Sequence, residues 1–363
     1  MALDSNNNID FIEKLISAPQ EALEHLNLKY VARDQLSILR IRKENGFLYL
    51  YKNKPLLQKK QLKRIKELVI PPAWADVKIA PLENAHLQAI GADSKKRTQY
   101  RYHPIWLKLR NRTKFYKMLP FGKALPKIRA RVEKDLELPG WPKNKVLALI
   151  VRLMEETHIR VGNEQYAKRN KTYGLSTLRT KHIKQLDGKI RFEFTGKKGK
   201  KHKITLRNKK LIHLVNKCEE IPGWELFQFY NDNGEKMSVD SGMVNDYIHE
   251  ISGHLFTAKD FRTWAGTVIF FETLGETPIT AKKKSREKNI IKAYDATAKA
   301  LGNTRNVCKK YYVHPLIPKM YNEGVLDNYL DQADKSKENN YYAPSEITVL
   351  QLIEKYKPLK NLN

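Results

Sequence analysis

Apolar and polar positions alternate along much of the first hundred residues, as in strands with one buried face. Two such runs, 37–42 and 47–51, flank Asn45-Gly46, a pair that favours a tight hairpin turn. Three more strands are predicted at 77–79, 86–90 and 98–103. Helices are predicted at 1–30 and at 58–68, the second ending before the prolines of 70–74. We therefore predict a small, mainly β domain over 1–105.

From Trp106 onward the apolar spacing changes to the three- and four-residue repeat of helices. Residues 147–154 are almost continuously apolar, which indicates a buried helix. A three-stranded meander is predicted at 174–178, 189–194 and 202–206. Residues from 207 on are predicted to be mostly helical. The predicted fold class is α+β, with a larger, mainly α catalytic domain over 106–363 that carries a short three-stranded sheet.

The charge of the chain indicates what kind of partner it binds. The chain has 363 residues, of which 68 are Lys or Arg and 39 are Asp or Glu, and its net charge is +29. Residues 106–131 contain nine Lys or Arg and no acid, so we expect this basic connector to lie against phosphates. An excess of this size, clustered in the sequence, favours a polyanionic partner such as a nucleic acid.

Composition also excludes several classes of protein. Two cysteines, Cys218 and Cys308, are too few for a disulfide framework or a cysteine-based zinc site. Residues 1–20 lack the basic and apolar regions of a secretory signal, and no apolar run approaches the ~18 residues of a membrane span. We expect a cytoplasmic protein that works where DNA is, with no membrane association.

A set of six residues suits the breakage of a phosphodiester without a metal. The set is Arg160, Lys197, Lys259, Arg262, Asn303 and Tyr312. A tyrosine can attack phosphorus, guanidiniums can hold the charge on the phosphate oxygens, and a lysine can protonate the departing oxygen. Tyrosine has a pKa near 10, so attack at neutral pH requires cationic neighbours. The adjacent Tyr311 is an alternative nucleophile that composition does not separate from Tyr312.

Two of these positions have a simpler interpretation as well. Residues 195–210 contain eight Lys or Arg and no acid, which is typical of a solvated hairpin tip but also suits a lysine that reaches a phosphate. Lys259 and Arg262 lie three residues apart, so on a helix they share one face. Such pairs are often surface residues only, although a guanidinium can also bind phosphate through two hydrogen bonds.

Short motifs along the whole chain resemble the type IB DNA topoisomerases in their compact bacterial and poxvirus form. In the first part these are Ile-Pro-Pro-Ala-Trp at 70–74, His-Leu-Gln-Ala at 86–89, Gly-Ala-Asp at 91–93 and Gln-Tyr-Arg-Tyr-His at 99–103. In the second part these are Arg-Val-Gly-Asn-Glu at 160–164, Gly-Leu-Ser-Thr-Leu at 174–178, Lys-His-Ile at 181–183, Phe-Thr-Gly-Lys at 194–197, Lys-Asp-Phe-Arg-Thr at 259–263 and the block 301–312. Each motif is short, but their order and spacing together are specific.

The resemblance implies a role for each member of the set. Tyr312, nine residues after the Leu-Gly-Asn position, would be the nucleophile. Arg160 and Arg262 would brace the nonbridging oxygens of the scissile phosphate. Lys197 would be the general acid for the 5′-oxygen, and Arg160 and Lys259 could share that role.

Further implications concern the DNA contacts and one departure from the family pattern. Many family members have histidine where this chain has Asn303, whose amide can donate a hydrogen bond but carries no charge. The resemblance implies DNA contacts for Gln99, Tyr100 and Tyr102. The basic turn suggests DNA contacts for Lys198, Lys200 and Lys201. The two tyrosines have an alternative interpretation as buried aromatics on one face of a strand.

The implied activity is relaxation of supercoiled DNA. One strand is cleaved through a 3′-phosphotyrosyl intermediate and then religated, without ATP, a metal or another cofactor. The two domains would form a C-shaped clamp around double-stranded DNA, and one tyrosine in one clamp predicts a monomer. The expected setting is the bacterial nucleoid or a viral equivalent.

Three other functions fit parts of the sequence. A tyrosine recombinase or integrase shares the nucleophile and the arginine pair, but usually has histidine where this chain has Lys259. A non-enzymatic basic DNA-binding protein would bind DNA without a covalent adduct. A metal nuclease could use Asp232, Asp240 and Asp246, although Asn-Asp-Asn-Gly at 231–234 is more simply a turn.

Overall fold

The computed structural model describes residues 19–24, 26–253, 256–278, 280–335 and 341–356. The chain forms a first compact unit that ends at Tyr116 and a second that begins at Lys117. The boundary predicted at 105 falls inside helix α4 (Pro104–Thr113), which stays whole in the first unit. The reason is packing, because Trp106 and Leu109 form a buried cluster with Leu23 and Leu28.

The first unit is built on a six-stranded antiparallel sheet in the order β3-β2-β1-β4-β5-β6. Its strands are β1 (Ile38–Lys43), β2 (Gly46–Tyr51), β3 (Lys54–Pro55), β4 (Ala75–Ile79), β5 (Leu87–Ala92) and β6 (Thr98–Tyr102). The predicted hairpin is confirmed, since Lys43 pairs with Gly46 across the turn. The three further predicted strands are confirmed as well.

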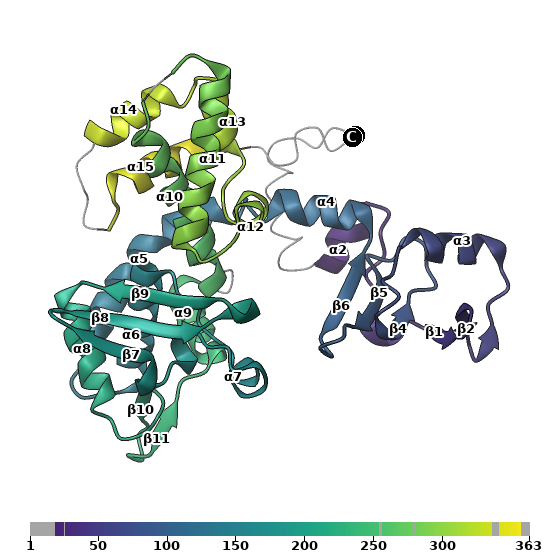
Figure 1. The fold of residues 1–363 in the computed structure, drawn as a ribbon, viewed down its shortest axis with the longest axis horizontal. Coiled ribbons are helices and arrows are strands. Elements are labelled where there is room, and N and C mark those ends of the chain that lie inside the picture. Colours follow the sequence, from purple (N-terminus) through teal and green to yellow (C-terminus); the bar gives the residue numbers. More distant parts are fainter. Residues whose placement is uncertain (1–18, 25, 254–255, 279, 336–340, 357–363) are drawn as a thin grey trace. The chain divides into compact units, whose positions relative to one another are not determined.

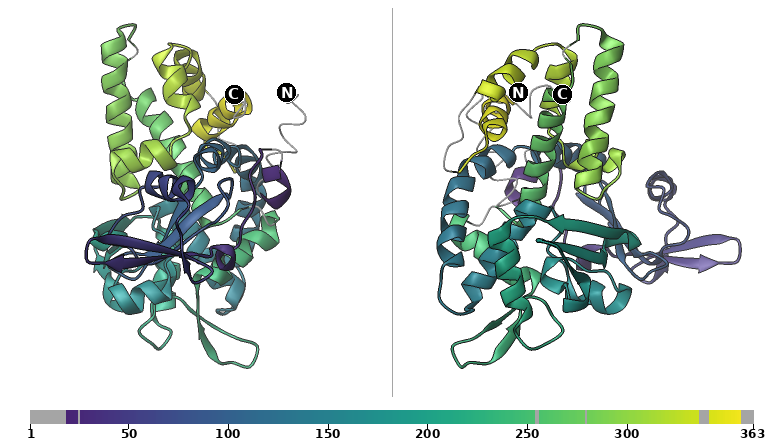
Figure 2. Two further views of the ribbon diagram at one scale, coloured as in Figure 1. Left: turned by 90° about the vertical axis from the view of Figure 1, so that its right-hand side faces the viewer. Right: turned by 60° about the vertical axis from the view of Figure 1, so that its left-hand side comes forward.

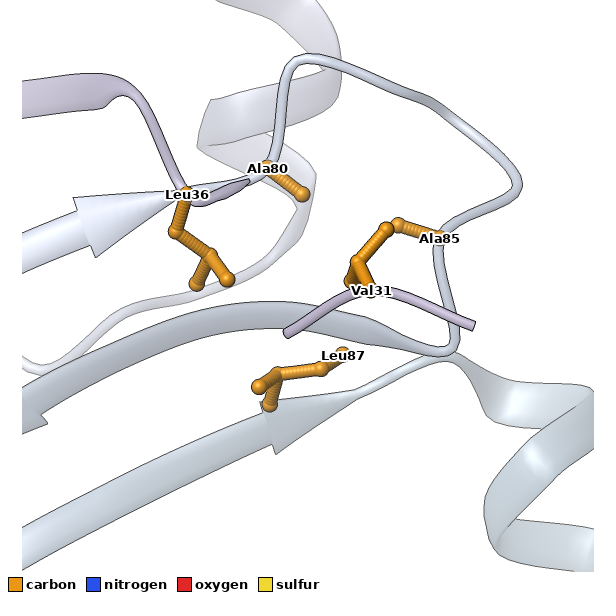
Figure 3. Packing of buried hydrophobic residues seen from close by; sticks show 5 residues of the cluster. All are labelled: Val31, Leu36, Ala80, Ala85 and Leu87. Atoms are coloured by element: carbon orange, nitrogen blue, oxygen red, sulfur yellow. The ribbon is translucent and has the colours of Figure 1, made fainter. Parts of the chain in front are cut away.

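Helices α2 (Pro19–Glu24) and α3 (Lys59–Glu67) belong to the same unit as this sheet. Figure 3 shows one apolar cluster of the unit, formed by Val31, Leu36, Ala80, Ala85 and Leu87. A second cluster brings Ile65 of α3 against Ile38, Val77, Ile79 and Ala89 of the sheet. The predicted helix at 58–68 is confirmed, whereas most of that predicted at 1–30 lies outside the described residues.

The second unit is mainly helical (Figure 1). Its described helices are α5 (Met118–Leu136), α6 (Lys143–Thr157), α7 (Glu164–Asn170), α8 (Lys209–Glu219), α9 (Ser241–Ser252), α10 (Ala258–Gly275), α11 (Lys283–Ala300), α12 (Arg305–Tyr311), α13 (Leu316–Asn322), α14 (Asp327–Lys335) and α15 (Pro344–Glu354). The predicted buried helix is α6, which is buried from Val146 to Val151. No helix in the described ranges is both long enough and apolar enough to cross a bilayer.

A three-stranded sheet, in the order β7-β8-β9, lies against α6 and α8 (Figure 1). Its strands are β7 (Ile183–Leu186), β8 (Lys189–Thr195) and β9 (Lys201–Leu206). The first strand predicted at 174–178 is wrong, because 175–177 form a 3₁₀ turn. The N–H groups of Leu175 and Ser176 donate to the carbonyls of Arg160 and Val161 instead of to a strand.

A short hairpin, β10 (Gln228–Tyr230) and β11 (Lys236–Ser238), interrupts the helices that follow. Figure 2 shows this hairpin and helix α11 at opposite ends of the second unit. Asn231 and Gly234 close the hairpin through a backbone hydrogen bond of 2.9 Å, which confirms the predicted turn.

Part of the basic connector at 106–131 forms ion pairs within the protein. Four of its cations pair with carboxylates of the second unit, at Lys117–Asp260, Lys123–Glu354, Arg129–Glu346 and Arg131–Asp135. Arg129 also donates to Glu155 at 3.0 Å, so its guanidinium joins α5 to both α6 and α15. Packing of α5 into the helical core thus uses four of the connector's nine charges, and contact of the connector with phosphates stays a prediction.

Candidate active site

Arg262 lies at the centre of the candidate site. It stands one turn into α10, whose start is fixed by a hydrogen bond from the Thr257 N–H to the Asp260 carboxylate. The side chain is only 4% exposed. Its Nη2 donates to the Leu301 carbonyl at 2.8 Å, and its Nη1 donates to the His158 carbonyl. Burial and the neighbouring Arg160 lower the pKa of Arg262 to about 10, so the group remains a cation at neutral pH.

Arg160 reaches the same place from the segment after α6. His158 ends that helix in the left-handed region, with φ of 54°, and the chain then runs extended between the buried Ile159 and Val161. Gly174 lies so close that a Cβ placed on it would come 2.4 Å from the Arg160 carbonyl oxygen. The 3₁₀ turn at 175–177 therefore fixes the backbone of Arg160, and only glycine allows the approach.

Asn303 is the third group of the site. Its Oδ1 accepts a hydrogen bond of 2.5 Å from Arg160 Nη2, which directs the amide Nδ2 elsewhere. Asn303 Nδ2 and Arg262 Nε are both buried and make no hydrogen bond of ordinary geometry among the described residues, although the Cys308 thiol and the Tyr312 phenol lie beside these two side chains. Buried donors are rarely left unpaired, so two at one site indicate an acceptor that comes from outside the chain.

Tyr312 follows α12 and lies against α10. Its carbonyl accepts a hydrogen bond of 3.1 Å from Thr267 Oγ1, and a Cβ on Gly266 would come 3.1 Å from the Tyr312 Cβ. The Arg262 Cζ lies 5.4 Å from the centre of the phenol ring. Burial by itself would raise the pKa of Tyr312, but the charges of Arg262 and Arg160 outweigh it, so the pKa lies below its ordinary value.

The structure also separates the two neighbouring tyrosines. Tyr311 is 41% exposed, and its ring lies beside Lys310. The phenol of Tyr312 is buried and lies beside Arg262 and Arg160, whose charges lower its pKa. Tyr312 therefore lies among the other predicted site residues, whereas Tyr311 is exposed beside a lysine.

Lys197 lies at the start of the turn between β8 and β9 and is exposed. It lines a small hollow together with His158, Arg160 and His202. The next residue, Lys198, has a φ of 65°, and Lys200 and Lys201 are exposed on the same turn. The turn thus brings Lys197 to this hollow, and Lys200 lies close enough to lower the pKa of His202.

Lys259 is placed less definitely. It lies in the first turn of α10, three residues before Arg262, and its side chain is exposed. No hydrogen bond or ion pair of its ammonium group is seen within the described part of the chain. Contacts or a shared hollow thus join five of the six predicted residues, and Lys259 lies beside them without a contact.

In the first unit, Tyr100 and Tyr102 lie on one face of β6. Their rings stack at 5.8 Å, and the Tyr100 hydroxyl accepts a hydrogen bond from Arg33 at 2.5 Å. Both pack against the apolar cluster of Figure 3. Gln99 donates to Asp93 at 3.0 Å. The interpretation as packed strand aromatics therefore holds, and contact with DNA stays a prediction.

Sequence reasoning missed two histidines at the site. Burial and the charge of Arg262 lower the pKa of His158 to about 4. Burial and the charges of Arg160, Lys200 and Arg262 lower that of His202 to about 4. No pattern in the sequence marks either, because their neighbours come from distant segments.

The described structure does not bring Asp232, Asp240 and Asp246 together as a metal site. Asp240 accepts the Met243 N–H at 2.9 Å and so caps α9, and Asp232 lies in the β10–β11 turn. Within the described ranges, no three His, Cys, Asp or Glu residues come together in a way that could hold a metal ion.

Comparison with known families agrees with this geometry. Residues 104–338 match the model of the eukaryotic DNA topoisomerase I catalytic core, which includes all six predicted site residues. Residues 46–93 match the model of the bacterial DNA topoisomerase IB N-terminal domain.

Individual relatives point the same way. DNA topoisomerase 1B of Acanthamoeba polyphaga mimivirus is 38% identical over 286 residues, which cover 76% of this chain and 84% of the relative. DNA topoisomerase 1B of Vaccinia virus (strain Copenhagen) is 24% identical over 68% of this chain and 75% of its own. DNA topoisomerase 1 of Rabbit fibroma virus is 27% identical over 69% of this chain and 78% of its own. The resemblance seen in the sequence is thus confirmed, and the chain belongs to the type IB DNA topoisomerase family.

Proposed function

We propose that Tyr312 is the nucleophile with which this chain relaxes supercoiled double-stranded DNA. The observation that carries the proposal is a pair of buried donors without a well-formed hydrogen bond, Arg262 Nε and Asn303 Nδ2, beside a phenol whose pKa Arg262 and Arg160 lower. A scissile phosphate supplies oxygen acceptors for both donors. It also places phosphorus next to the tyrosine.

The reaction is a pair of transesterifications. The Tyr312 hydroxyl loses its proton to water and its oxygen bonds to phosphorus. The bond from phosphorus to the 5′-oxygen breaks, and Lys197 gives that oxygen a proton. The product is a 3′-phosphotyrosyl link and a free 5′-hydroxyl. The cut duplex can then rotate about the intact strand, which releases torsion. Attack by the 5′-hydroxyl then reseals the strand and releases Tyr312. Each step exchanges one phosphodiester for another, so the scheme needs neither ATP nor a metal.

Charge on the phosphate is held by groups that are already in place. Arg262 and Arg160 face the nonbridging oxygens, and Asn303 supplies a neutral hydrogen bond where many relatives have histidine. Such fixed donors stabilise a transition state without the cost of reorganising water. Lys259, exposed at the start of α10, is near enough in sequence to Arg262 to assist Lys197 in proton transfer.

The remaining predicted contacts concern the duplex. Lys198, Lys200 and Lys201 would bind phosphates at the rim of the site. Gln99, Tyr100 and Tyr102 would bind DNA from the first unit. A C-shaped clamp of the two units, acting as a monomer, would account for these contacts and for the net charge of +29. Binding should then weaken steeply as salt concentration rises, because DNA binding releases counterions.

The test is plasmid relaxation without ATP and with EDTA, comparing the wild type with Tyr312→Phe. Tyr311→Phe is the matched control, since it removes the neighbouring hydroxyl. We expect the wild type and the control to relax the plasmid. We expect Tyr312→Phe to bind the plasmid without relaxing it and without forming a denaturant-resistant adduct.

Three outcomes would reject the proposal. Loss of activity in Tyr311→Phe but not in Tyr312→Phe would move the nucleophile by one residue. A wild type that binds DNA but never relaxes it would favour a non-enzymatic DNA-binding protein. Strand exchange between paired sites, in place of relaxation, would favour a recombinase.

A further inference from the structure

The ring of His202 occupies a narrow space beside the candidate site. His202 lies near the start of β9, directly after the turn that carries Lys197. Its imidazole stacks on Phe194 of β8, with ring centres 5.0 Å apart and planes 14° apart. The ring also lines the hollow that Lys197 and Arg160 share.

Two glycines from distant parts of the chain border this ring. A Cβ placed on Gly196 would lie 2.7 Å from His202 Cδ2, and one placed on Gly302 would lie 2.5 Å from His202 Cε1. Gly196 precedes Lys197, and Gly302 precedes Asn303. The imidazole therefore lies between the backbone that carries the proposed proton donor and the backbone that carries a phosphate-binding amide.

The chemistry of the ring suits a packing role. Its nitrogens make no hydrogen bond within the described part of the chain. Since burial and nearby cations lower the pKa of His202 to about 4, the ring is neutral at physiological pH. A neutral ring does not repel the charges of Arg160, Arg262 and Lys200. An ammonium or guanidinium group at this position would repel them.

We infer that His202 is a positioning residue that fixes the Lys197 turn against the Gly302-Asn303 loop. The inference rests on the proposed function, in which Lys197 protonates the 5′-oxygen. His202 transfers no proton in this scheme. It determines whether the Lys197 ammonium lies close enough to the departing oxygen for the proton to move as the bond to phosphorus breaks.

The closing experiment separates positioning of Lys197 from general damage to the site. Single-turnover cleavage is measured on ordinary DNA and on DNA with sulfur in place of the bridging 5′-oxygen. A thiolate leaves without a proton, so a defect in protonation disappears on the sulfur substrate, whereas a defect in the nucleophile or in phosphate binding does not. Misplacement by about 1 Å can cost roughly 10²-fold in rate, so we expect His202→Ala to be slowed by that order on ordinary DNA. We expect most of the loss to be recovered on sulfur.

A mutant cycle tests the contact itself and does not depend on His202→Ala alone. The methyl group of Gly196→Ala should push against the imidazole and slow cleavage of ordinary DNA. Gly196 has a φ of −98°, which alanine also adopts, so backbone strain is not introduced. In the His202→Ala background the same methyl group has space, and Gly196→Ala should then cost little more. Thermal melting and DNA-binding measurements establish that each variant is folded.

The outcomes separate failure of the inference about His202 from failure of the proposed function. If Lys197→Ala recovers on the sulfur substrate but His202→Ala is equally slow on both, the inference about His202 is overturned and the proposed function stands. Strictly additive effects of Gly196→Ala and His202→Ala would overturn it too. If Lys197→Ala itself gains nothing from sulfur, the general-acid role in the proposed function fails, and the inference that depends on it fails with it.

Discussion

The two sides of the candidate site are built in opposite ways. On one side, Arg262 is 4% exposed and donates to the carbonyls of His158 and Leu301 from the second turn of a buried helix. On the other side, Lys197 is exposed at a hairpin turn and has no such anchors. The side that we propose to stabilise charge is thus fixed by the core, while the side that we propose to donate the proton depends on how its turn packs.

This difference has a physical basis. A group that stabilises charge works best when it is immobile before the reaction. A group that delivers a proton must reach the leaving oxygen and withdraw again when the 5′-hydroxyl attacks in the resealing step. Substitutions on the two sides should therefore differ in whether they affect stability together with rate.

The largest effect is expected for Lys197→Ala. Loss of a general acid typically slows a reaction by about 10²–10⁴-fold, and because the side chain is exposed, the free energy of unfolding should hardly change. Single-turnover cleavage and urea denaturation measure the two quantities. The adjacent Lys198→Ala is the control, and a larger rate loss there would shift the assignment by one residue.

Arg262→Ala should reduce both quantities. Removing a preorganised donor costs about 10²–10³-fold in rate, while DNA affinity should change little. The carbonyls of His158 and Leu301 would lose their donor, which costs about 1–3 kcal/mol of unfolding free energy for each group left unpaired. Arg262→Lys keeps the charge but not the two anchors and should remain destabilised. Near-wild-type cleavage by the alanine variant would contradict the role given to Arg262.

Asn303→Ala should have a smaller effect on rate. It removes one neutral donor to the phosphate and releases Arg160, whose Nη2 now donates to Asn303 Oδ1 at 2.5 Å. Hydrogen bonds to charged groups contribute about 1.5–3 kcal/mol, so a loss of roughly 10–10²-fold is expected. Asn303→His, which restores the residue found in many relatives, should retain activity. Unchanged cleavage in Asn303→Ala would show that its free Nδ2 does not serve the phosphate.

The smallest effect concerns pH and stability. The pKa values of His158 and His202 are lowered to about 4 in the folded chain, whereas histidine in the unfolded chain titrates near 6.5. Between these values the unfolded chain binds protons that the folded chain does not. The free energy of unfolding should therefore fall as pH drops from 7 to 5. Urea midpoints at the two pH values measure this, and His202→Phe should show a weaker dependence. A midpoint unchanged between pH 7 and 5 would contradict the burial of these rings.

Several features were predictable because they depend on local pattern. The hairpin at Asn45-Gly46, helix α3, the buried helix α6 and the turn at 231–234 follow from turn chemistry and from apolar periodicity. The strand predicted at 174–178 failed because its alternating residues serve a different purpose. Its backbone groups bond to the Arg160 segment, and no pattern within five residues can reveal a distant partner.

The sequence by itself determined the family and the two-part organisation, and it supplied the residues that we propose for the chemistry. These depend on residue type, order and spacing, which are written in the chain. Only the tertiary structure decided that Tyr312 lies beside Arg160 and Arg262, that four of the connector's nine cations form ion pairs within the second unit, and that His202 lies between Gly196 and Gly302. Each of these depends on burial and on contacts between distant segments, because the solvent that a side chain loses and the charges that it meets are fixed only when the helices and strands pack together.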